Sequence, residues 1–151
     1  MQRFDVVIIG GGQSALAVAY YLRRTNVSLI ILDKAAEPGG SWQYYWKSLR
    51  LFSPAQFSSL PGILMTGGAN YYPSRDVVIE YLKHYETKYQ LPVKRPVEVL
   101  GVSQEEGRFR LDTTDGTYDC RALVSATGSF DHPNIPSINQ RNIFRGTVIH
   151  S

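Results

Sequence analysis

The chain has 151 residues, of which 43% are hydrophobic and 19% charged, and its net charge is +3. This length fits one globular domain, and because Lys and Arg are scattered along the chain, we expect no nucleic-acid partner. The single cysteine, Cys120, excludes an internal disulfide and a Cys-x-x-Cys redox pair. No apolar stretch approaches the ~20 residues of a membrane-spanning helix, and the N-terminus enters a strand without room for a signal peptide. We therefore expect a cytoplasmic protein without a membrane partner.

Residues 4–33 have the pattern of a β-α-β unit that binds a dinucleotide. The apolar run Phe4–Ile9 is typical of a buried parallel strand, and it leads directly into Gly10–Ala15, which fits the motif G-x-G-x-x-A. Apolar residues at helical spacing predict a helix over Ser14–Arg24, and Ser28–Leu32 predicts a second strand that ends at Asp33. The order of these parts predicts a dinucleotide site; the alternative is a glycine-rich turn in an ordinary unit.

Several positions of this unit have a physical role beside a pyrophosphate. Gly10 allows a tight turn, Gly12 lets the phosphates approach the backbone, and Ala15 is small enough for close packing of helix on strand. The start of the helix offers free N–H groups and the positive end of a dipole to the phosphates. Asp33 can accept hydrogen bonds from the hydroxyls of a ribose.

The next segment is irregular and rich in aromatic residues. Pro38, Gly39 and Gly40 break regular structure, and Gln43–Tyr72 has no clear period, so we expect at most one short helical turn in it. Irregular segments of this length inside a compact domain are usually functional or disordered, and the aromatic content argues against disorder. The aromatic side chains form either a packed loop cover or a wall around a flat aromatic ligand.

The remaining elements predict one helix and an antiparallel meander. Ser74 has the position of an N-cap, and apolar spacing predicts a helix that ends near Tyr89. A change to period two predicts three strands with glycine-containing turns between them, over Glu98–Gln104, Arg108–Thr113 and Thr117–Leu123. The third strand continues into Ala126-Thr127-Gly128, so we expect it to join the parallel sheet with its end beside the ligand.

Five motifs in this order resemble the flavin-containing monooxygenases and related bacterial flavoproteins with two dinucleotide-binding domains. They are the G-x-G-x-x-A motif, its acid Asp33, Gly39-Gly40-Ser41-Trp42, Ala126-Thr127-Gly128 followed by Pro133 and Pro136, and Phe144-x-Gly146-x-x-x-His150. The resemblance implies an α/β fold. It is a Rossmann-like FAD-binding domain over residues 1–151, with a parallel central sheet and a three-stranded antiparallel meander.

The resemblance also implies which residues contact FAD. They are Gly10, Gly12, Gln13, Ser14, Ala15, Asp33, Lys34, Gly40, Ser41, Trp42, Val99, Ala126, Thr127 and Gly128. Val99 lies on the strand whose backbone meets the adenine in the family, and we favour it over Val97. The alternative roles are a core aromatic for Trp42 and a strand-end cap for Thr127. No metal site is expected.

The activity implied by the resemblance is an NAD(P)H-dependent monooxygenase. NAD(P)H reduces FAD, and a C4a-peroxyflavin then transfers oxygen to a small-molecule substrate, a sulfide or an amine. Family members continue past the last motif into an NAD(P)H domain and then complete the FAD domain. We therefore expect this chain to be the N-terminal part of a longer protein. We expect His150 to be a structural histidine or part of a disordered end, and not a catalytic residue. A homodimer is one assembly that the sequence leaves open.

One stretch departs from the family pattern. Many members carry an Asn soon after the Trp segment, whereas Leu49–Pro54 contains none and has Phe52 near that place. An aromatic ring excludes water but donates no hydrogen bond. Phe52 is therefore our candidate catalytic position, with a core side chain as the alternative. The departure keeps an NAD(P)H–flavin reductase or oxidase and a non-catalytic flavin module open, whereas the aromatic segment and the meander disfavour an NAD-dependent dehydrogenase.

Overall fold

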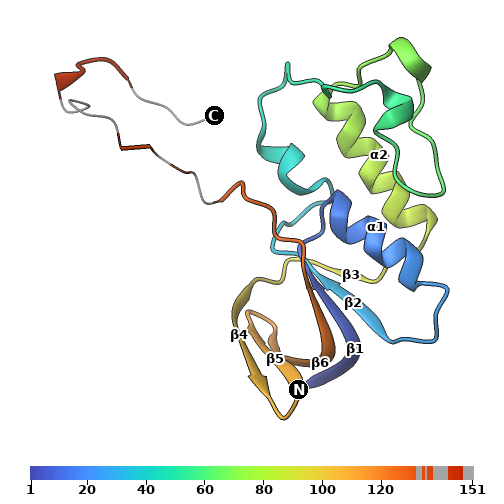
Figure 1. The fold of residues 1–151 in the computed structure, drawn as a ribbon, viewed down its shortest axis with the longest axis vertical. Coiled ribbons are helices and arrows are strands. Elements are labelled where there is room, and N and C mark those ends of the chain that lie inside the picture. Colours follow the sequence, from blue (N-terminus) through green and yellow to red (C-terminus); the bar gives the residue numbers. More distant parts are fainter. Residues whose placement is uncertain (132–133, 135, 138–142, 148–151) are drawn as a thin grey trace.

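The computed structural model of the chain describes residues 1–131, 134, 136, 137 and 143–147. Pro133 and His150, which belong to two of the predicted motifs, lie outside the described residues. Two α-helices and six strands form the body, and the described residues after Asp131 lead away from it (Figure 1).

The six strands form one sheet in the order β3-β2-β1-β6-β5-β4. Strands β3, β2, β1 and β6 are parallel neighbours, whereas β4, β5 and β6 form an antiparallel meander. The bounds are β1 Gln2–Ile9, β2 Leu29–Leu32, β3 Val93–Lys94, β4 Val99–Glu105, β5 Arg108–Thr113 and β6 Gly116–Ser125. The predicted α/β fold with a parallel centre and a meander is confirmed, and both turn glycines, Gly107 and Gly116, have the positive φ that the hairpins require.

The two helices lie on the same side of the sheet (Figure 1). They are α1, Gln13–Leu22, and α2, Arg75–Lys88. Their apolar faces share a core with alternate residues of the first two strands, including Leu16 and Leu82 from the helices and Ile8 from β1. The side-chain alternation of a strand sends Val7 to the opposite face. There, a second core forms under the meander with Leu111, Tyr118 and Cys120 among its members.

The aromatic segment contains more structure than the sequence predicted. Three short 3₁₀ helices occur where at most one helical turn was expected, at Gly40–Tyr44 (η1), Ala55–Phe57 (η2) and Gly68–Asn70 (η3). Hydroxyl groups of α2 hold this segment. The Tyr81 hydroxyl accepts from the Leu60 N–H at 2.7 Å and donates to the Ile63 carbonyl at 2.8 Å, and the Tyr85 hydroxyl donates to the Pro61 carbonyl at 2.7 Å. These contacts are long-range, so no local pattern predicts them.

One strand was missed from the sequence, and one predicted N-cap is confirmed without a capping side chain. Strand β3 was not predicted, because two residues carry no periodicity and the strand exists only by pairing with β2. Ser74 does occupy the N-cap of α2, but its side chain makes no capping hydrogen bond. The start of α2 is instead held by the next N–H, from Arg75, which donates to the Leu49 carbonyl at 2.8 Å.

Among the described residues, no helix is both long and apolar enough to cross a bilayer.

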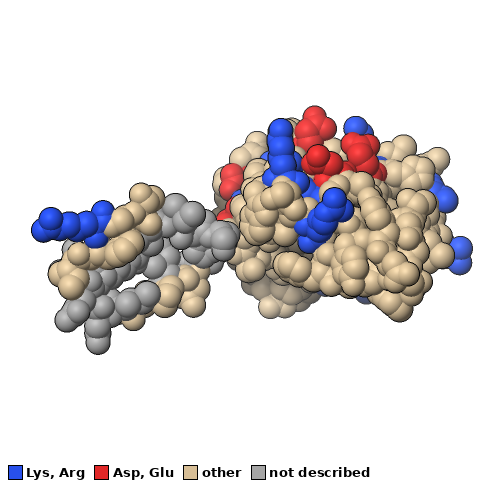
Figure 2. Space-filling model, turned by 90° about the horizontal axis from the view of Figure 1, so that it is seen from above, with Lys and Arg blue, Asp and Glu red and all other residues tan. Residues whose placement is uncertain are grey.

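Basic and acidic side chains are interspersed on the face drawn in Figure 2, so no patch of one sign covers that face.

Candidate dinucleotide site

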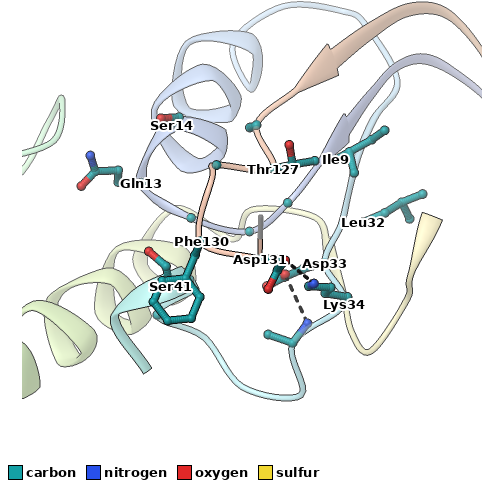
Figure 3. Close-up of a pocket in the computed structure, with 18 of the residues that line it drawn as sticks. Ile9, Gln13, Ser14, Leu32, Asp33, Lys34, Ser41, Thr127, Phe130 and Asp131 are labelled. Atoms are coloured by element: carbon teal, nitrogen blue, oxygen red, sulfur yellow. Dashed lines mark hydrogen bonds and ion pairs between the residues drawn. The ribbon is translucent and has the colours of Figure 1, made fainter. Parts of the chain in front are cut away.

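A cleft of about 740 Å³ opens where β1, β2 and β6 end. Ile9 pairs with Leu32 on one side and with Ser125 on the other, so the carboxyl ends of the three strands lie level. The chain leaves β1 toward β2 on one side, whereas β6 joins from the other. Open α/β sheets bind ligands at this kind of switch point. Figure 3 shows side chains from these strand ends and from the start of α1 around the cleft.

The turn that leaves β1 can be formed only by glycine at position 10. Gly10 has φ +98°, and a Cβ on it would lie 2.5 Å from the Ala126 carbonyl oxygen. Backbone hydrogen bonds fix the same junction, from the Gly10 N–H to the Leu32 carbonyl at 2.8 Å and from the Ala126 N–H to the Ile9 carbonyl at 2.9 Å. The ends of the three strands are therefore locked together at the floor of the cleft.

Gly12 faces open space. It is the N-cap of α1 with φ −83°, and a Cβ there would meet no protein atom within 4 Å. Gln13 and Ser14 follow it, are exposed and line the cleft. The first turn of α1 has no acidic residue and no side-chain cap, so its N–H groups and the positive end of the helix are available to an anion.

The segment with Ser41 and Trp42 forms the opposite wall. Gly40 packs against the loop of residues 10–12, which we call the phosphate loop, because a Cβ on Gly40 would lie 2.9 Å from the Gly12 Cα atom. Helix α2 anchors this wall through Arg75, which donates to the Trp42 carbonyl at 2.9 Å and to the Gln43 carbonyl at 2.8 Å. Trp42 lines the cleft and also packs on the helical core, as the alternative of a core aromatic requires, and its contact with FAD stays a prediction.

The end of β2 places Asp33 in the cleft wall. Its backbone is fixed by two hydrogen bonds, from its N–H to the Lys94 carbonyl at 3.1 Å and from the Val97 N–H to its carbonyl at 2.8 Å. The side chain is 7% exposed, and its Oδ2 accepts from Arg95 Nε at 2.8 Å. Burial by itself lowers the pKa of the Arg95 guanidinium, but hydrogen bonds to Glu86 and Asp33 outweigh it and raise that pKa.

A short strap after β6, residues 127–131, crosses the open side of the cleft. Asp131 forms an ion pair with Lys34, and its hydrogen bond raises the pKa of the Lys34 ammonium group. The Phe130 ring stacks on Tyr44 at 5.5 Å between centroids and meets Tyr45 edge-on at 5.2 Å. Figure 3 shows Phe130 and Asp131 on this strap. The strap is thus joined to both walls of the cleft.

Most of the predicted residues come together in this cleft. Those that line it are Gly10, Gly12, Gln13, Ser14, Asp33, Lys34, Gly40, Ser41, Trp42, Val99, Ala126, Thr127 and Gly128. Ala15 does not line it but is fully buried on the inner face of α1, as its role in close packing requires. Val97 also lines it, beside the favoured Val99.

Phe52 lies apart from the other predicted residues. It does not line the cleft, and it is 95% exposed. Within these 151 residues Phe52 is therefore not a core side chain, and the two alternatives for it in the complete protein stay open. Its predicted place near the flavin stays a prediction.

Sequence reasoning missed several lining residues, namely Gly11, Tyr44, Tyr45, Phe130 and Asp131. The aromatic clustering did indicate a wall around a flat ligand, but only some aromatics of the segment, including Trp42 and the two tyrosines, reach the cleft. No signal in the sequence pairs Asp131 with Lys34. Within the part of the chain that the structure describes, no group of three or more His, Cys, Asp or Glu side chains is arranged to hold a metal ion.

Comparison with known families decides the assignment. Residues 7–150 match the family described as pyridine nucleotide-disulphide oxidoreductase. The chain belongs to this family. Flavin monooxygenases are among the solved structures that are similar to this chain. The structure of a flavin monooxygenase from Stenotrophomonas maltophilia is 47% identical with a TM-score of 0.91, over 97% of this chain and 44% of that one. The predicted resemblance to flavin monooxygenases is confirmed.

Two curated relatives extend the comparison. The uncharacterized oxidoreductase CzcO of Bacillus subtilis is 39% identical over 91% of this chain. The probable indole-3-pyruvate monooxygenase YUCCA8 of Arabidopsis thaliana is 32% identical over 96% of it. The chain spans 40% and 37% of the length of these two relatives.

Proposed function

We propose that the cleft binds FAD, with the pyrophosphate on the phosphate loop and the adenosine ribose at Asp33. The single observation that carries this proposal is the open space over Gly12 at the uncapped start of α1. A phosphate there would accept hydrogen bonds from the first-turn N–H groups and lie at the positive end of the helix. Relatives that are flavin monooxygenases support flavin over NAD as the dinucleotide.

The residues of the cleft fit the two ends of this cofactor. Asp33 offers carboxylate oxygen to ribose hydroxyls, and Val99, at the start of β4, lines the cleft with apolar surface for an adenine. Ser41 and Trp42 form the wall that would run along the flavin side. Tyr44, Tyr45 and Phe130 would exclude water from the bound molecule, since their rings pack together at the open side.

At the level of the longer protein, we propose an NAD(P)H-using flavin monooxygenase whose substrate is a sulfide or an amine. Bound FAD would supply hydride acceptance and oxygen transfer. In this proposal, the role of the present chain is to bind the cofactor, to orient it between the two walls of the cleft and to keep water away from it. The chain contains one G-x-G-x-x-A fingerprint, which we assign to FAD, so NAD(P)H has no dedicated fingerprint within these 151 residues.

A flavin-dependent reductase is the second candidate. A bacillithiol disulfide reductase from Staphylococcus aureus is 28% identical with a TM-score of 0.77, over 85% of this chain and 39% of that one. Leu49–Pro54 also lacks the Asn that many monooxygenases carry. Cys120 does not serve such a reductase as a redox thiol, because it is fully buried in β6 and burial raises the pKa of its thiol.

The test is to identify and measure the bound ligand. Purified chain is heated, the released ligand is run beside FAD, FMN and NAD standards, and stripped protein is titrated with each. We expect FAD to bind and NAD to bind far more weakly. Release of NAD without flavin, or equal affinity for both, contradicts the proposal.

A second measurement separates binding from turnover. Because positioning the two reactants contributes several kcal/mol to catalysis and no second fingerprint is present, FAD-loaded chain should oxidise NAD(P)H no faster than free FAD does. Rapid NAD(P)H oxidation by a preparation whose mass matches the 151-residue chain would show that this segment also holds the hydride donor.

A further inference from the structure

Behind the cleft wall, three charged side chains from separate elements meet in the interior. Arg95, in the connection from β3 to β4, donates from Nε to Asp33 Oδ2 at 2.8 Å and from Nη1 to Glu86 Oε1 of α2 at 2.7 Å. The exposed fractions of the three side chains are 9% for Arg95, 7% for Asp33 and 17% for Glu86. Asp33 lines the cleft, whereas Arg95 and Glu86 do not.

This network is a poor device for stability alone. Removing three charges from water costs free energy that their mutual attraction rarely exceeds, and apolar residues of similar volume often serve as well. Two polar atoms here, Arg95 Nη2 and Glu86 Oε2, are buried and have no hydrogen-bond partner among the described residues. The arrangement therefore needs another explanation, and Asp33 is the one of its three members that lines the cleft.

The network also touches the phosphate loop at Gly11. A Cβ on Gly11 would collide with Asp33 Oδ2 and would lie 2.7 Å from Arg95 Nη2. The φ angle at this position is not in the left-handed region, so the need for glycine is steric. The loop that faces the pyrophosphate thus rests directly on the Asp33–Arg95 pair, which connects it to α2 through Glu86.

We propose that Arg95 is a positioning residue for the adenosine ribose, which it serves through Asp33. By holding Oδ2 against its guanidinium, Arg95 fixes the rotation of the carboxylate and leaves Oδ1 to accept from a ribose hydroxyl. Among the described residues, Oδ1 accepts only one hydrogen bond, a long one from the Ala35 N–H at 3.3 Å. Glu86 in turn fixes the guanidinium. This inference rests on the proposed binding of FAD.

The test measures whether Arg95 acts on the ribose hydroxyls in particular. Wild-type chain and Arg95→Met are loaded with FAD, and ADP or 2′,3′-dideoxyADP is used to displace it, with flavin fluorescence as the readout. We expect wild type to bind ADP about tenfold more tightly than the dideoxy analogue, the effect of one hydrogen bond to a charged group. Arg95→Met should lose this preference and bind the analogue as wild type does.

The matched control removes an Arg–Asp pair far from the cleft. Arg108 pairs with Asp119 across β5 and β6, at the other end of the sheet from the phosphate loop. Arg108→Met should keep the preference for ADP, whatever it does to the melting temperature. An equal loss of affinity for both nucleotides in Arg95→Met would mean that the network is merely structural, and would overturn the positioning role while FAD binding stands.

The remaining outcomes are also decisive. Wild type that binds FAD without preferring ADP over its dideoxy analogue would overturn the ribose role of Asp33 and with it that of Arg95. Wild type that binds no flavin would overturn the proposed function itself. If Arg95→Met does not fold, Glu86→Gln is used; it keeps the Asp33–Arg95 pair and should reduce the preference about threefold, because a neutral amide oxygen accepts from the guanidinium more weakly than a carboxylate does. An unchanged preference in folded Glu86→Gln overturns the proposal.

Discussion

The β1-α1-β2 unit and the aromatic segment 43–72 border the same cleft in different ways. In the β1-α1-β2 unit, local requirements dictate each contact, such as the positive φ of Gly10 and the small side chain of Ala15. In the aromatic segment, hydroxyl and guanidinium groups of α2 hold the backbone from outside. One wall of the cleft thus takes its shape from local sequence requirements, whereas the other is held in place by α2, a helix that lies later in the chain.

The two regions also differ in what they leave exposed. The body of the β1-α1-β2 unit is buried, with Val7, Ile8 and Ala15 fully removed from water. The aromatic segment exposes large apolar side chains, with Phe52 at 95% and Phe57 at 72%. Changes in the glycine loop of the first region, or in the contacts that hold the wall at Trp42 and Gln43, should therefore alter ligand affinity. Changes elsewhere in the second region should alter stability or leave both unchanged. Four variants test this difference.

The largest effect is expected for Gly12→Val. A branched side chain would fill the space for the pyrophosphate, so several charge-assisted hydrogen bonds would be lost and FAD affinity should fall by at least about 100-fold. The melting temperature should change little, because no protein atom lies within 4 Å of the new Cβ. Gly101→Val is the control, since Gly101 also faces open space but lies in β4. Flavin retained at one per chain in Gly12→Val would contradict the assigned phosphate loop.

Arg75→Ala tests the connection between α2 and the cleft. It removes both hydrogen bonds that hold the backbone at Trp42 and Gln43, so the wall should loosen and FAD affinity should fall about tenfold. Arg50→Ala is the matched control, because Arg50 donates at 2.9 Å to the Tyr72 carbonyl, in the same segment but outside the cleft lining. Titration of both variants decides the point: equal losses of affinity would mean that general loosening of the segment is responsible.

A smaller effect, on stability alone, is expected for Tyr85→Phe. Burial raises the pKa of the Tyr85 hydroxyl, so the group stays protonated and donates to the Pro61 carbonyl. Its removal leaves that carbonyl without its donor and should lower the free energy of unfolding by about 1–2 kcal/mol, with FAD affinity unchanged. Tyr21→Phe, on an exposed ring, should change neither quantity. Denaturant unfolding measures the first quantity and flavin titration the second.

The smallest effect on this chain is expected for Phe52→Asn. An exposed side chain without special contacts should change the free energy of unfolding by less than about 0.5 kcal/mol, and Phe57→Asn should behave alike. In a protein of the relatives' full length, we expect the new amide to lower the release of hydrogen peroxide per NAD(P)H consumed and to raise sulfoxide formation. An unchanged ratio of peroxide to sulfoxide there would reject a role for Phe52 beside the flavin.

The sequence predicted the β1-α1-β2 unit, α2 and the meander, because each carries a local period or a turn residue. Gly107 and Gly116 are examples, since a tight hairpin demands the positive φ that they adopt. It also predicted most of the cleft lining, because the ends of parallel strands meet at one edge. The resemblance supplied Ser41, Trp42 and Val99, which no periodicity singles out.

The parts that the sequence did not predict depend on long-range contacts. Strand β3 needs β2 as its template, and the backbone of the aromatic segment at Leu60 and Pro61 is held by hydroxyl groups of α2. The network of Asp33, Glu86 and Arg95 joins positions 62 and 9 residues apart, too far for any local motif. Buried charge networks of this kind become visible only when the chain is folded.

The packing of Gly11 on the Asp33–Arg95 pair has a consequence for how this sequence can vary. The G-x-G-x-x-A motif leaves its second position free, yet here a side chain at that position would have to displace the Asp33 carboxylate and the Arg95 guanidinium. Homologous chains that carry Arg at position 95 and Asp at position 33 should therefore keep glycine at position 11. Chains with a larger residue at position 11 should lack this arginine, so the identities of two positions 84 apart in the chain should change together.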